Sequence, residues 1–423
     1  MERFALSRMK EWKENENRKP LIIRGARQVG KTWIMKTFGQ QYFEKTAYVN
    51  FDNNARMKQV FEGDLDIERL VLSISAETGV SIEAENTLII FDEVQEVPKA
   101  LTSLKYFYEN APQYAIVAAG SLLGVALHQG TSFPVGKVDF LDLYPLNFRE
   151  FLCAMGEKQF VSMLDSCDTQ MVTVFKTKYI ERLREYYFVG GMPEVVKDFS
   201  EKKDYNRVRA IQKNLINYYQ QDFSKHAEIK LVPRLNLVWN SIPMQLAKEN
   251  KKYIYGQVRE GSRAKDFELA IQWLLDCGLI HKVQRIQKPD LPLKAYIDFD
   301  AFKLFLVDIG LLIAMTDLDA KVIIEGNKIF TEFKGALTEQ YILQQLISDV
   351  GVIPYYYSTQ NSKGEIDFLV QGKTSVIPIE VKAEENLKAK SLKAFCEKYQ
   401  PSYAVRTSMS DYREQDWMTN IPL

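Results

Sequence analysis

The chain has 423 residues, 46% of them hydrophobic and 26% charged, which is the composition of an ordinary folded protein. This length exceeds what a single hydrophobic core usually organises, so we expect about two to four domains. Lysine plus arginine and aspartate plus glutamate both number 55, so the formal net charge is zero, which argues against a strongly basic nucleic-acid coat but not against a local basic patch.

The start of the chain does not predict a signal peptide, because residues 1–19 are charged and polar. The longest apolar stretches, around 115–127 and 304–315, are short or interrupted by Asp308, and neither can span a bilayer. Four scattered cysteines without a CxxC pair, and only three histidines, argue against a structural zinc site and for reduced thiols. We therefore expect a cytoplasmic protein with no membrane partner.

Apolar runs alternate with helical periodicity from about residue 20 to residue 146. Strands that alternate with helices form a parallel sheet covered on both faces. The sequence thus predicts an α/β domain over residues 1–150. Its strands are expected at 21–24, 47–52, 87–91, 114–119 and 138–143.

A phosphate-binding motif follows the first of these strands. Residues 25–32 have the spacing Gly-x4-Gly-Lys-Thr and lead from a strand into a helix, which is the context that this P-loop motif requires. Its backbone N–H groups and the helix N-terminus would bind a triphosphate, Lys31 would neutralise the β- and γ-phosphates, and Thr32 would ligate Mg²⁺. The alternative is a glycine-containing turn. We expect ATP or ADP to contact Gly25, Ala26, Arg27, Gln28, Val29, Gly30, Lys31, Thr32 and Trp33.

Two acidic residues end the apolar strand 88–91. Asp92 would hold Mg²⁺ through water, and Glu93 would polarise the water that attacks ATP. Adjacent acids after a strand can also form a solvated loop, but their place after a P-loop favours the catalytic interpretation. We therefore assign Mg²⁺ to Thr32 and Asp92, and catalysis to Lys31 and Glu93.

Ser121 follows the strand 114–119 and Gly120. A small polar side chain at this place could orient the attacking water, so we include Ser121 among the catalytic residues. A serine here is equally suited to cap a helix N-terminus, and one side chain can do both.

These motifs together resemble a known family. Arg-Gly-Ala-Arg-Gln-Val-Gly-Lys-Thr, Phe-Asp-Glu-Val-Gln, Ala-Gly-Ser-Leu-Leu and Tyr-Pro-Leu-Asn-Phe-Arg-Glu-Phe are similar to a widespread prokaryotic family of AAA ATPases that carry a C-terminal domain of unknown function. The resemblance covers essentially the whole chain. It implies an extra strand between the P-loop strand and the acidic strand, and a Gly-x-Pro element in a helical lid, here Gly191-Met192-Pro193, that places Pro193 at the base.

No single arginine is marked as a finger that would complete another subunit's site. Arg149 and Lys137 are candidates, and a surface salt bridge is the alternative for each. The missing finger leaves open a homo-oligomer or a partner protein that supplies the residue.

The middle of the chain predicts a helical lid at 151–228 and a winged-helix segment at 229–325, with wing strands at 283–286 and 303–307. Basic residues near this segment could follow a DNA backbone. The alternative is a solvated face on a domain that only packs against other domains. These basic residues are Arg259, Arg263, Lys265, Lys282 and Arg285.

The last segment, 326–423, predicts a small α/β domain that opens with a helix at 330–348. Strands are expected at 355–358, 365–370, 376–381 and 403–407, and a helix at 392–399. Glu339 lies on the first helix and Asp367 on a strand, and Glu380-Val381-Lys382 ends the next strand, where alternation places Glu380 and Lys382 on one face.

This order of acids and lysine resembles the restriction-endonuclease-like nuclease core. The resemblance implies a second Mg²⁺ or Mn²⁺ on Glu339, Asp367 and Glu380, with Lys382 as a catalytic residue. Such cores also serve as inactive DNA-binding or docking modules, so cleavage of nucleic acid stays open.

The sequence therefore predicts an α/β fold: a P-loop NTPase parallel sheet with a helical lid, a winged-helix segment and a small restriction-endonuclease-like domain. The leading hypothesis is an ATPase that drives a conformational switch coupled to a domain acting on DNA or RNA. The alternative is a nucleotide-dependent protein-interaction switch whose last domain only docks a partner. A metabolic kinase is disfavoured, because the Asp-Glu pair suits the activation of water.

Overall fold

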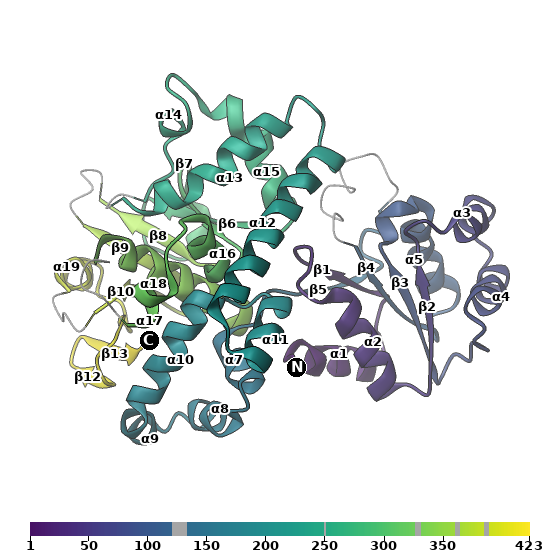
Figure 1. The fold of residues 1–423 in the computed structure, drawn as a ribbon, viewed down its shortest axis with the longest axis horizontal. Coiled ribbons are helices and arrows are strands. Elements are labelled where there is room, and N and C mark those ends of the chain that lie inside the picture. The colour runs from purple at the N-terminus through teal and green to yellow at the C-terminus, as the bar shows by residue number, and fades with distance from the viewer. Residues whose placement is uncertain (121–132, 249–250, 326–330, 360–363, 385–388) are drawn as a thin grey trace. The chain divides into compact units, whose positions relative to one another are not determined.

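The computed structural model describes residues 1–120, 133–248, 251–325, 331–359, 364–384 and 389–423 (Figure 1). The chain divides into two compact units. The N-terminal unit is Glu2–Tyr144 with Asp276–Leu279, and the C-terminal unit is Pro145–Leu275 and Ile280–Leu423 with Met1.

The N-terminal unit contains a parallel sheet with strand order β2-β3-β4-β1-β5. The expected strands of this domain are confirmed to within two residues at each end. As predicted, β4 lies between the P-loop strand β1 and the acidic strand β3. The bounds are Leu21–Arg24 for β1, Lys45–Asn50 for β2, Thr87–Asp92 for β3, Ala115–Ala119 for β4 and Asp139–Asp142 for β5.

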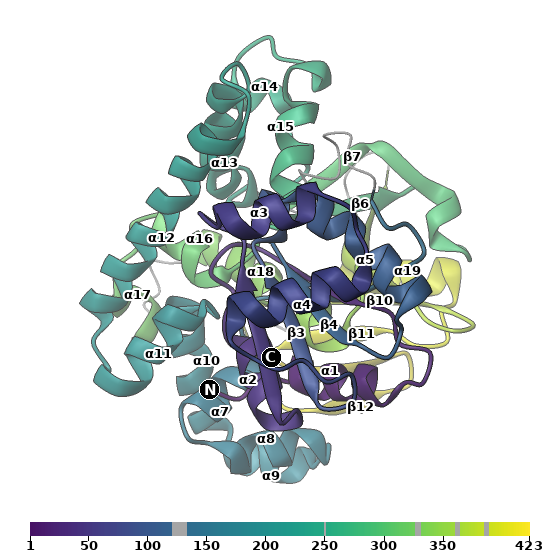
Figure 2. The ribbon, with the colours of Figure 1, turned by 90° about the vertical axis from the view of Figure 1, so that its right-hand side faces the viewer.

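Helices cover both faces of this sheet, as strands that alternate with helices require. The core on one face combines side chains of the strands with those of α3, α4 and α5, and Figure 2 shows α3 and α4 in front of the strands. Contacts of α2 with the strands, and of α1 with α2, cover the other face. The bounds are Ala5–Glu14 for α1, Lys31–Tyr42 for α2, Ala55–Glu62 for α3, Ile67–Thr78 for α4 and Pro98–Asn110 for α5.

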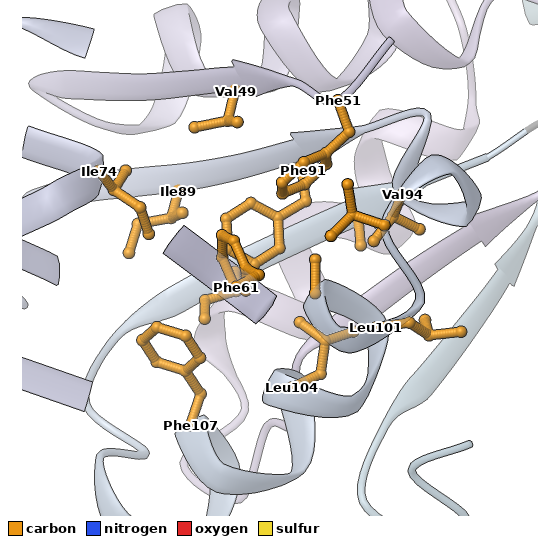
Figure 3. Packing of buried hydrophobic residues seen from close by; sticks show 14 of the residues in the cluster. Val49, Phe51, Phe61, Ile74, Ile89, Phe91, Val94, Leu101, Leu104 and Phe107 are labelled. Carbon is orange, nitrogen blue, oxygen red and sulfur yellow. The ribbon is translucent and has the colours of Figure 1, made fainter. Parts of the chain in front are cut away.

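Aromatic packing holds the end of β3 in place (Figure 3). The Phe91 ring lies edge-on to Phe51 and Phe61, at centroid separations of 5.4 and 5.6 Å, and 6.5 Å from Phe107. All four rings are buried. Because edge-to-face rings add to the free energy of burial, this cluster fixes the backbone immediately before Asp92.

The helical part of the C-terminal unit begins directly after the N-terminal sheet. A capping box, in which Asn147 and Glu150 satisfy each other's backbone N–H groups, starts its first helix. The bounds are Phe148–Ala154 for α7, Lys158–Asp165 for α8, Thr169–Val174 for α9, Lys176–Val189 for α10, Pro193–Lys202 for α11, Tyr205–His226 for α12, Val232–Leu246 for α13, Tyr255–Val258 for α14, Ala264–Asp276 for α15, Ile309–Met315 for α16 and Ala320–Ile324 for α17.

The sheet of the C-terminal unit has the order β12-β13-β11-β10-β9-β8-β6-β7. The two strands expected for the wing are present as the antiparallel pair β6–β7, and β6 also pairs in parallel with β8. The winged helix itself stays a prediction. The sheet therefore contains strands from both sides of residue 326, because this pairing joins distant parts of the chain. The four domain boundaries stay predictions. The strands are Ile280–Ile286 (β6), Ile297–Leu306 (β7), Tyr355–Ser358 (β8), Glu365–Gln371 (β9), Val376–Val381 (β10), Val405–Ser408 (β11), Arg413–Gln415 (β12) and Met418–Pro422 (β13).

The helix expected at 330–348 is present as α18, Thr331–Gln345, and continues as a short π-helix, Leu346–Val350; residue 330 lies outside the described residues. The expected helix near 392–399 is α19, Lys390–Tyr399. It packs its apolar side on the sheet through Leu392 and Phe395. No helix in the described part of the chain is long and apolar enough to cross a membrane.

Candidate nucleotide site

The P-loop backbone turns sharply between β1 and α2, and its glycines make this turn feasible. Gly25 has φ +144°, and a Cβ there would lie 2.1 Å from the carbonyl oxygen of Leu143. Gly30, at the N-cap of α2, has φ 96° in the left-handed region. Side chains are disfavoured at both positions, so the loop has the close, N–H-rich path that phosphate binding needs.

Lys31 is folded against its own loop. Its Nζ donates to the carbonyl oxygens of Gly25 (2.9 Å) and Ala26 (2.8 Å), and the side chain is buried. Burial lowers the pKa of Lys31 to about 8, although the Glu93 and Asp92 carboxylates oppose this shift. The ammonium is therefore within electrostatic reach of both acidic residues.

Asp92 is almost fully buried and receives two hydroxyl donors. The Thr32 hydroxyl donates to Asp92 Oδ2 at 2.7 Å, and the Tyr48 hydroxyl donates to the same oxygen at 2.9 Å. Burial, and then the charge of Asp92, raise the pKa of Tyr48 well above its usual value, so Tyr48 stays protonated and can only donate to the carboxylate.

The donor set at Thr32 and Asp92 fits Mg²⁺, which prefers oxygen ligands and is usually held by one or two protein groups together with substrate phosphates and water. A hydroxyl and a carboxylate oxygen only 2.7 Å apart offer this chemistry beside the P-loop. Within the described ranges, no group of three or more acidic, histidine or cysteine side chains could hold a metal ion by itself.

Glu93 has an unusual backbone, with φ 51° and ψ 45° in the left-handed region that non-glycine residues rarely adopt. The Gln95 side chain holds its carboxylate, because Gln95 Nε2 donates to Glu93 Oε2 at 2.7 Å. Strained residues of this kind persist where their surroundings over-determine them, often at functional sites.

Three residues at this site received no role in the sequence analysis: Arg3, Tyr48 and Gln95, the last of which ends the Phe-Asp-Glu-Val-Gln motif. Arg3 donates to the carbonyl oxygen of Val29 at 3.0 Å and to that of Tyr144 at 2.6 Å, and so supports the P-loop from the segment before α1. Gln95 could have been singled out by its place two residues after Glu93. For Arg3 and Tyr48 the sequence gives no comparable signal, since both act through the tertiary fold.

The other predicted nucleotide residues have different environments. Trp33 is 43% exposed on the first turn of α2. Ser121 lies outside the described residues. Pro193 begins α11 in the C-terminal unit, and its contact with a nucleotide stays a prediction.

The glycines before Pro193 have a structural role within the C-terminal unit. The Gly191 N–H donates to Asp308 Oδ2 at 2.6 Å, and its carbonyl oxygen accepts from the N–H of Leu146 at 2.7 Å. A Cβ on Gly190 would lie 2.2 Å from Asp308 Oδ1, and one on Gly191 would lie 2.1 Å from the Leu146 oxygen. The glycine pair therefore lets two backbone segments and a buried carboxylate meet.

Lysines neutralise the acids that we predicted as the second metal site. Glu339 is buried and pairs with Lys251 and, at 3.6 Å, with Lys303. Lys303 is fully buried on β7 and also pairs with Glu365. Burial would lower the pKa of Lys303, but Glu339, Glu365 and Asp367 outweigh it and raise that pKa.

Asp367 and Glu380 lie on the antiparallel neighbours β9 and β10, whose register brings these two positions opposite each other. Burial and the nearby Glu339 charge raise the pKa of Asp367 to about 7, and its Oδ2 accepts from the backbone N–H of Val381. Glu380 pairs with Lys382 at 2.7 Å. The predicted residues thus do gather, but ammonium groups already balance their charge, and the predicted second metal gains no support.

The basic residues of the expected wing are engaged within the chain. Arg285 pairs with Asp298, and the Lys282 ammonium lies 4.3 Å from the centroid of the Phe302 ring. Among the finger candidates, Arg149 pairs with Asp165 and Asp349, and Lys137 pairs with Glu109. These contacts agree with the salt-bridge and packing alternatives, and the roles in trans and on DNA stay predictions.

Comparison with protein families agrees with the geometry of the nucleotide site. Residues 17–152 match the model of a family described as an AAA domain. This part of the chain is therefore a P-loop domain of the AAA type. Residues 180–322 and 334–423 match two domains of unknown function, DUF8612 and DUF4143. No curated protein matches the sequence.

Solved structures of low similarity include a Walker-type ATPase of Pyrococcus abyssi, with 15% identity and a TM-score of 0.46, covering 74% of this chain and 95% of that one. A second is the Aeropyrum pernix Orc1 protein in complex with DNA, with 12% identity and a TM-score of 0.27, covering 74% of this chain and 91% of that one. A third is the Thermotoga maritima RuvB Holliday junction branch migration motor, with 11% identity and a TM-score of 0.29, covering 66% of this chain and 87% of that one. At these scores the likenesses add nothing to the fold described above.

Proposed function

We propose that this chain binds ATP with Mg²⁺ at the P-loop and hydrolyses it, and that nucleotide turnover drives a conformational switch. Lys31 binds the β- and γ-phosphates, Thr32 and Asp92 hold Mg²⁺, and Glu93 takes a proton from the attacking water. Mg²⁺, when bound, draws charge from the phosphate oxygens.

The observation that carries the proposal is the hydrogen bond of 2.7 Å between Thr32 and Asp92, beside the buried Lys31. It brings the P-loop and the end of β3 together across the intervening strand β4. A glycine-rich turn without a nucleotide would have no need for a buried carboxylate at this distance, because burying a charge costs free energy even when neutral hydroxyls donate to it.

Nucleotide binding tests the first part of this proposal. We expect the purified protein to bind a fluorescent ATP analogue in the presence of Mg²⁺, and Lys31→Ala to lose this binding by at least about 100-fold, since a charge-assisted contact to phosphate disappears. Lys58→Ala is a control, because Lys58 is an exposed lysine on α3 of the same unit. Equal affinity in the Lys31→Ala and wild-type proteins would remove the P-loop from the account.

For the C-terminal domain, we propose a docking module that does not cleave nucleic acid. The ion pairs of Lys251 and Lys303 with Glu339 and Glu365 support this choice over a nuclease, because they balance the carboxylates that a divalent cation would need. The partner is then a protein, and ATP turnover changes how the module is presented to it.

Cleavage assays distinguish the two functions of the C-terminal domain. Single- and double-stranded DNA and RNA are incubated with the protein and Mg²⁺ or Mn²⁺, with and without ATP, next to the double variant Asp367→Ala/Glu380→Ala. We expect no cutting that depends on these two residues. Cutting by the wild type that the double variant lacks would replace the docking proposal with an ATPase-coupled nuclease.

A further inference from the structure

Gln95 has a buried amide oxygen whose partner the chain does not supply. Its Nε2 donates to Glu93 Oε2 at 2.7 Å, while Oε1 is buried and accepts no hydrogen bond from the residues that the structure describes. The orientation of the amide follows from chemistry, because a carboxylate only accepts and therefore selects the NH₂ side. A buried acceptor without a donor destabilises the fold, so its retention calls for an explanation.

The position of this oxygen gives the explanation. Oε1 and Nε2 share one amide carbon, so Oε1 lies next to the carboxylate that Nε2 holds. Glu93 in turn donates its backbone N–H to Asp92 Oδ1 at 3.1 Å, and the other oxygen of Asp92 accepts from Thr32 of the phosphate-binding loop at 2.7 Å. A water molecule beside Glu93 could therefore donate one hydrogen to the carboxylate and the other to Gln95 Oε1.

We propose that Gln95 is a catalytic residue for ATP hydrolysis, whose amide nitrogen holds Glu93 and whose amide oxygen accepts a hydrogen bond from the attacking water. This inference rests on the proposed ATPase function and names a second group at the same water. Two acceptors fix both O–H bonds of the water, and one oxygen lone pair then points at the γ-phosphorus.

The reaction step balances with these groups. The water oxygen forms a bond to the γ-phosphorus while the bond from that phosphorus to the β–γ bridging oxygen breaks, and its electron pair leaves with ADP. The water proton that is hydrogen-bonded to Glu93 passes to the Glu93 carboxylate, and the O–H bond breaks. The water proton that is hydrogen-bonded to Gln95 stays on the oxygen that joins the new phosphate. Gln95 itself exchanges no proton, as an amide should not.

The structure also explains why Gln95 and Glu93 keep this relation. Val94 between them is fully buried, the short helix Val94–Glu96 fixes the backbone, and the left-handed φ of 51° at Glu93 sets where its side chain begins. A side chain at position 95 therefore has a defined approach to Glu93, and changes there alter chemistry more than nucleotide binding.

The experiment compares Gln95→Ala, Gln95→Glu and wild type by kcat, KM, pH–rate profile and affinity for an ATP analogue. We expect Gln95→Ala to lower kcat roughly 10- to 100-fold, the cost of one lost water or transition-state hydrogen bond, with ATP affinity within about twofold. Gln95→Glu keeps the shape but puts a second carboxylate beside Glu93. Like charges favour protonation, so the acidic limb of its profile moves to higher pH. Exposed Gln41, changed to alanine, is the matched control.

The outcomes separate the inference from the proposed function. Normal kcat and an unmoved pH profile in both Gln95 variants, with hydrolysis intact in wild type, would overturn the role of Gln95 alone. A kcat loss in Gln95→Ala that comes with an equal loss of nucleotide affinity would mark a structural role and overturn it as well. Binding of ATP without any hydrolysis by wild type would overturn both this role and the ATPase proposal.

Discussion

Asp92 and Glu93, at the end of β3, accept hydrogen bonds from different side chains, and this difference suggests different roles. Asp92 accepts from the hydroxyls of Thr32 and Tyr48, whereas Glu93 accepts from the amide of Gln95. In the function that we propose, the hydroxyl donors orient the Asp92 carboxylate that would share Mg²⁺ with Thr32. The amide of Gln95 would hold the Glu93 carboxylate beside the attacking water. Adjacent residues of the same charge can thus have separate roles in one site.

Tyr48→Phe tests the first of these partnerships. The change removes one hydrogen bond to a charged group, worth about 1.5–3 kcal/mol, while the ring and its cation–π contact with Lys36 remain. We expect the Mg²⁺ concentration for half-maximal nucleotide binding to rise about tenfold or more. Tyr106→Phe, on α5, is the control. An unchanged Mg²⁺ titration would show that the Tyr48 hydroxyl does not orient Asp92.

At the scale of elements, Asp308 joins several parts of the C-terminal unit. It caps α16 through the Leu311 N–H, accepts from Gly191 before α11, and accepts from Gln344 of α18 at 3.3 Å. Burial raises the pKa of Asp308 to about 6, although these donors oppose the shift. One buried carboxyl group therefore links the glycine turn to two helices.

This pKa gives a pH-dependent prediction. A carboxyl whose pKa is raised by folding stabilises the fold below its unfolded pKa, and this contribution is lost as pH rises through the folded value. From pH 4 to pH 6 the contribution of Asp308 to the free energy of unfolding should fall by about 2 kcal/mol. Asp308→Asn lacks this titration but also loses acceptors, so we expect it to be less stable than wild type throughout, with a difference that narrows as pH rises. Urea unfolding at pH 4, 5, 6 and 7 measures this difference. A constant or widening difference would contradict it.

Local elements of the fold could be predicted from the sequence, because their signals are local. The apolar runs at 21–24 and 87–91 alternate with segments of helical periodicity, and the P-loop lies between a strand and a helix. The strands and the position of the P-loop could therefore be predicted from the same pattern. The final strands β12 and β13 were missed, since short polar runs such as Arg413–Gln415 have no strand pattern of their own. Pairing of β6 with β8 was also missed, because residues about 70 positions apart meet there.

Buried charges were the hardest feature to predict. Lys303 lies in a run that alternation alone would place at a sheet surface, yet it is fully buried because Glu339 and Glu365 neutralise it. The order of Glu339, Asp367 and Glu380 along the chain predicted that these acids gather, but it did not indicate the lysines, which precede them by many residues. The pattern of acids therefore indicated that positive charge gathers beside them, but it did not indicate that lysines supply this charge.

At the scale of the whole molecule, the variant Lys303→Met tests whether lysines, and not a metal ion, balance the buried acids of the proposed docking module. Lys303→Met removes a buried ammonium and should lower the free energy of unfolding by about 3–5 kcal/mol, since Glu339 and Glu365 are left less balanced. We expect millimolar Mn²⁺ to raise the melting temperature of this variant and to leave wild type unchanged. Lys294→Met, at an exposed position, is the control. Equal stabilisation of wild type by Mn²⁺ would restore the metal site that we predicted from the sequence.

The course of the chain offers a route for the proposed switch. The chain leaves the N-terminal unit after Tyr144, and returns to it for Asp276–Leu279 between α15 and β6. Within the N-terminal unit, Gly278 lies against the P-loop, where a Cβ would be 3.1 Å from the backbone nitrogen of Ala26. A change in the P-loop can therefore act on Gly278, whose segment is joined by the chain to α15 and β6.

The most direct measurement is the fate of ATP bound to wild type and to Glu93→Gln in a single turnover with Mg²⁺. Glutamine keeps the size of the side chain and the contacts of the P-loop, but it cannot take a proton from water. The account predicts that both proteins bind ATP with similar affinity, that wild type converts it to ADP and phosphate, and that Glu93→Gln retains it at least about 100 times longer. Conversion of ATP by Glu93→Gln at the wild-type rate would contradict the account.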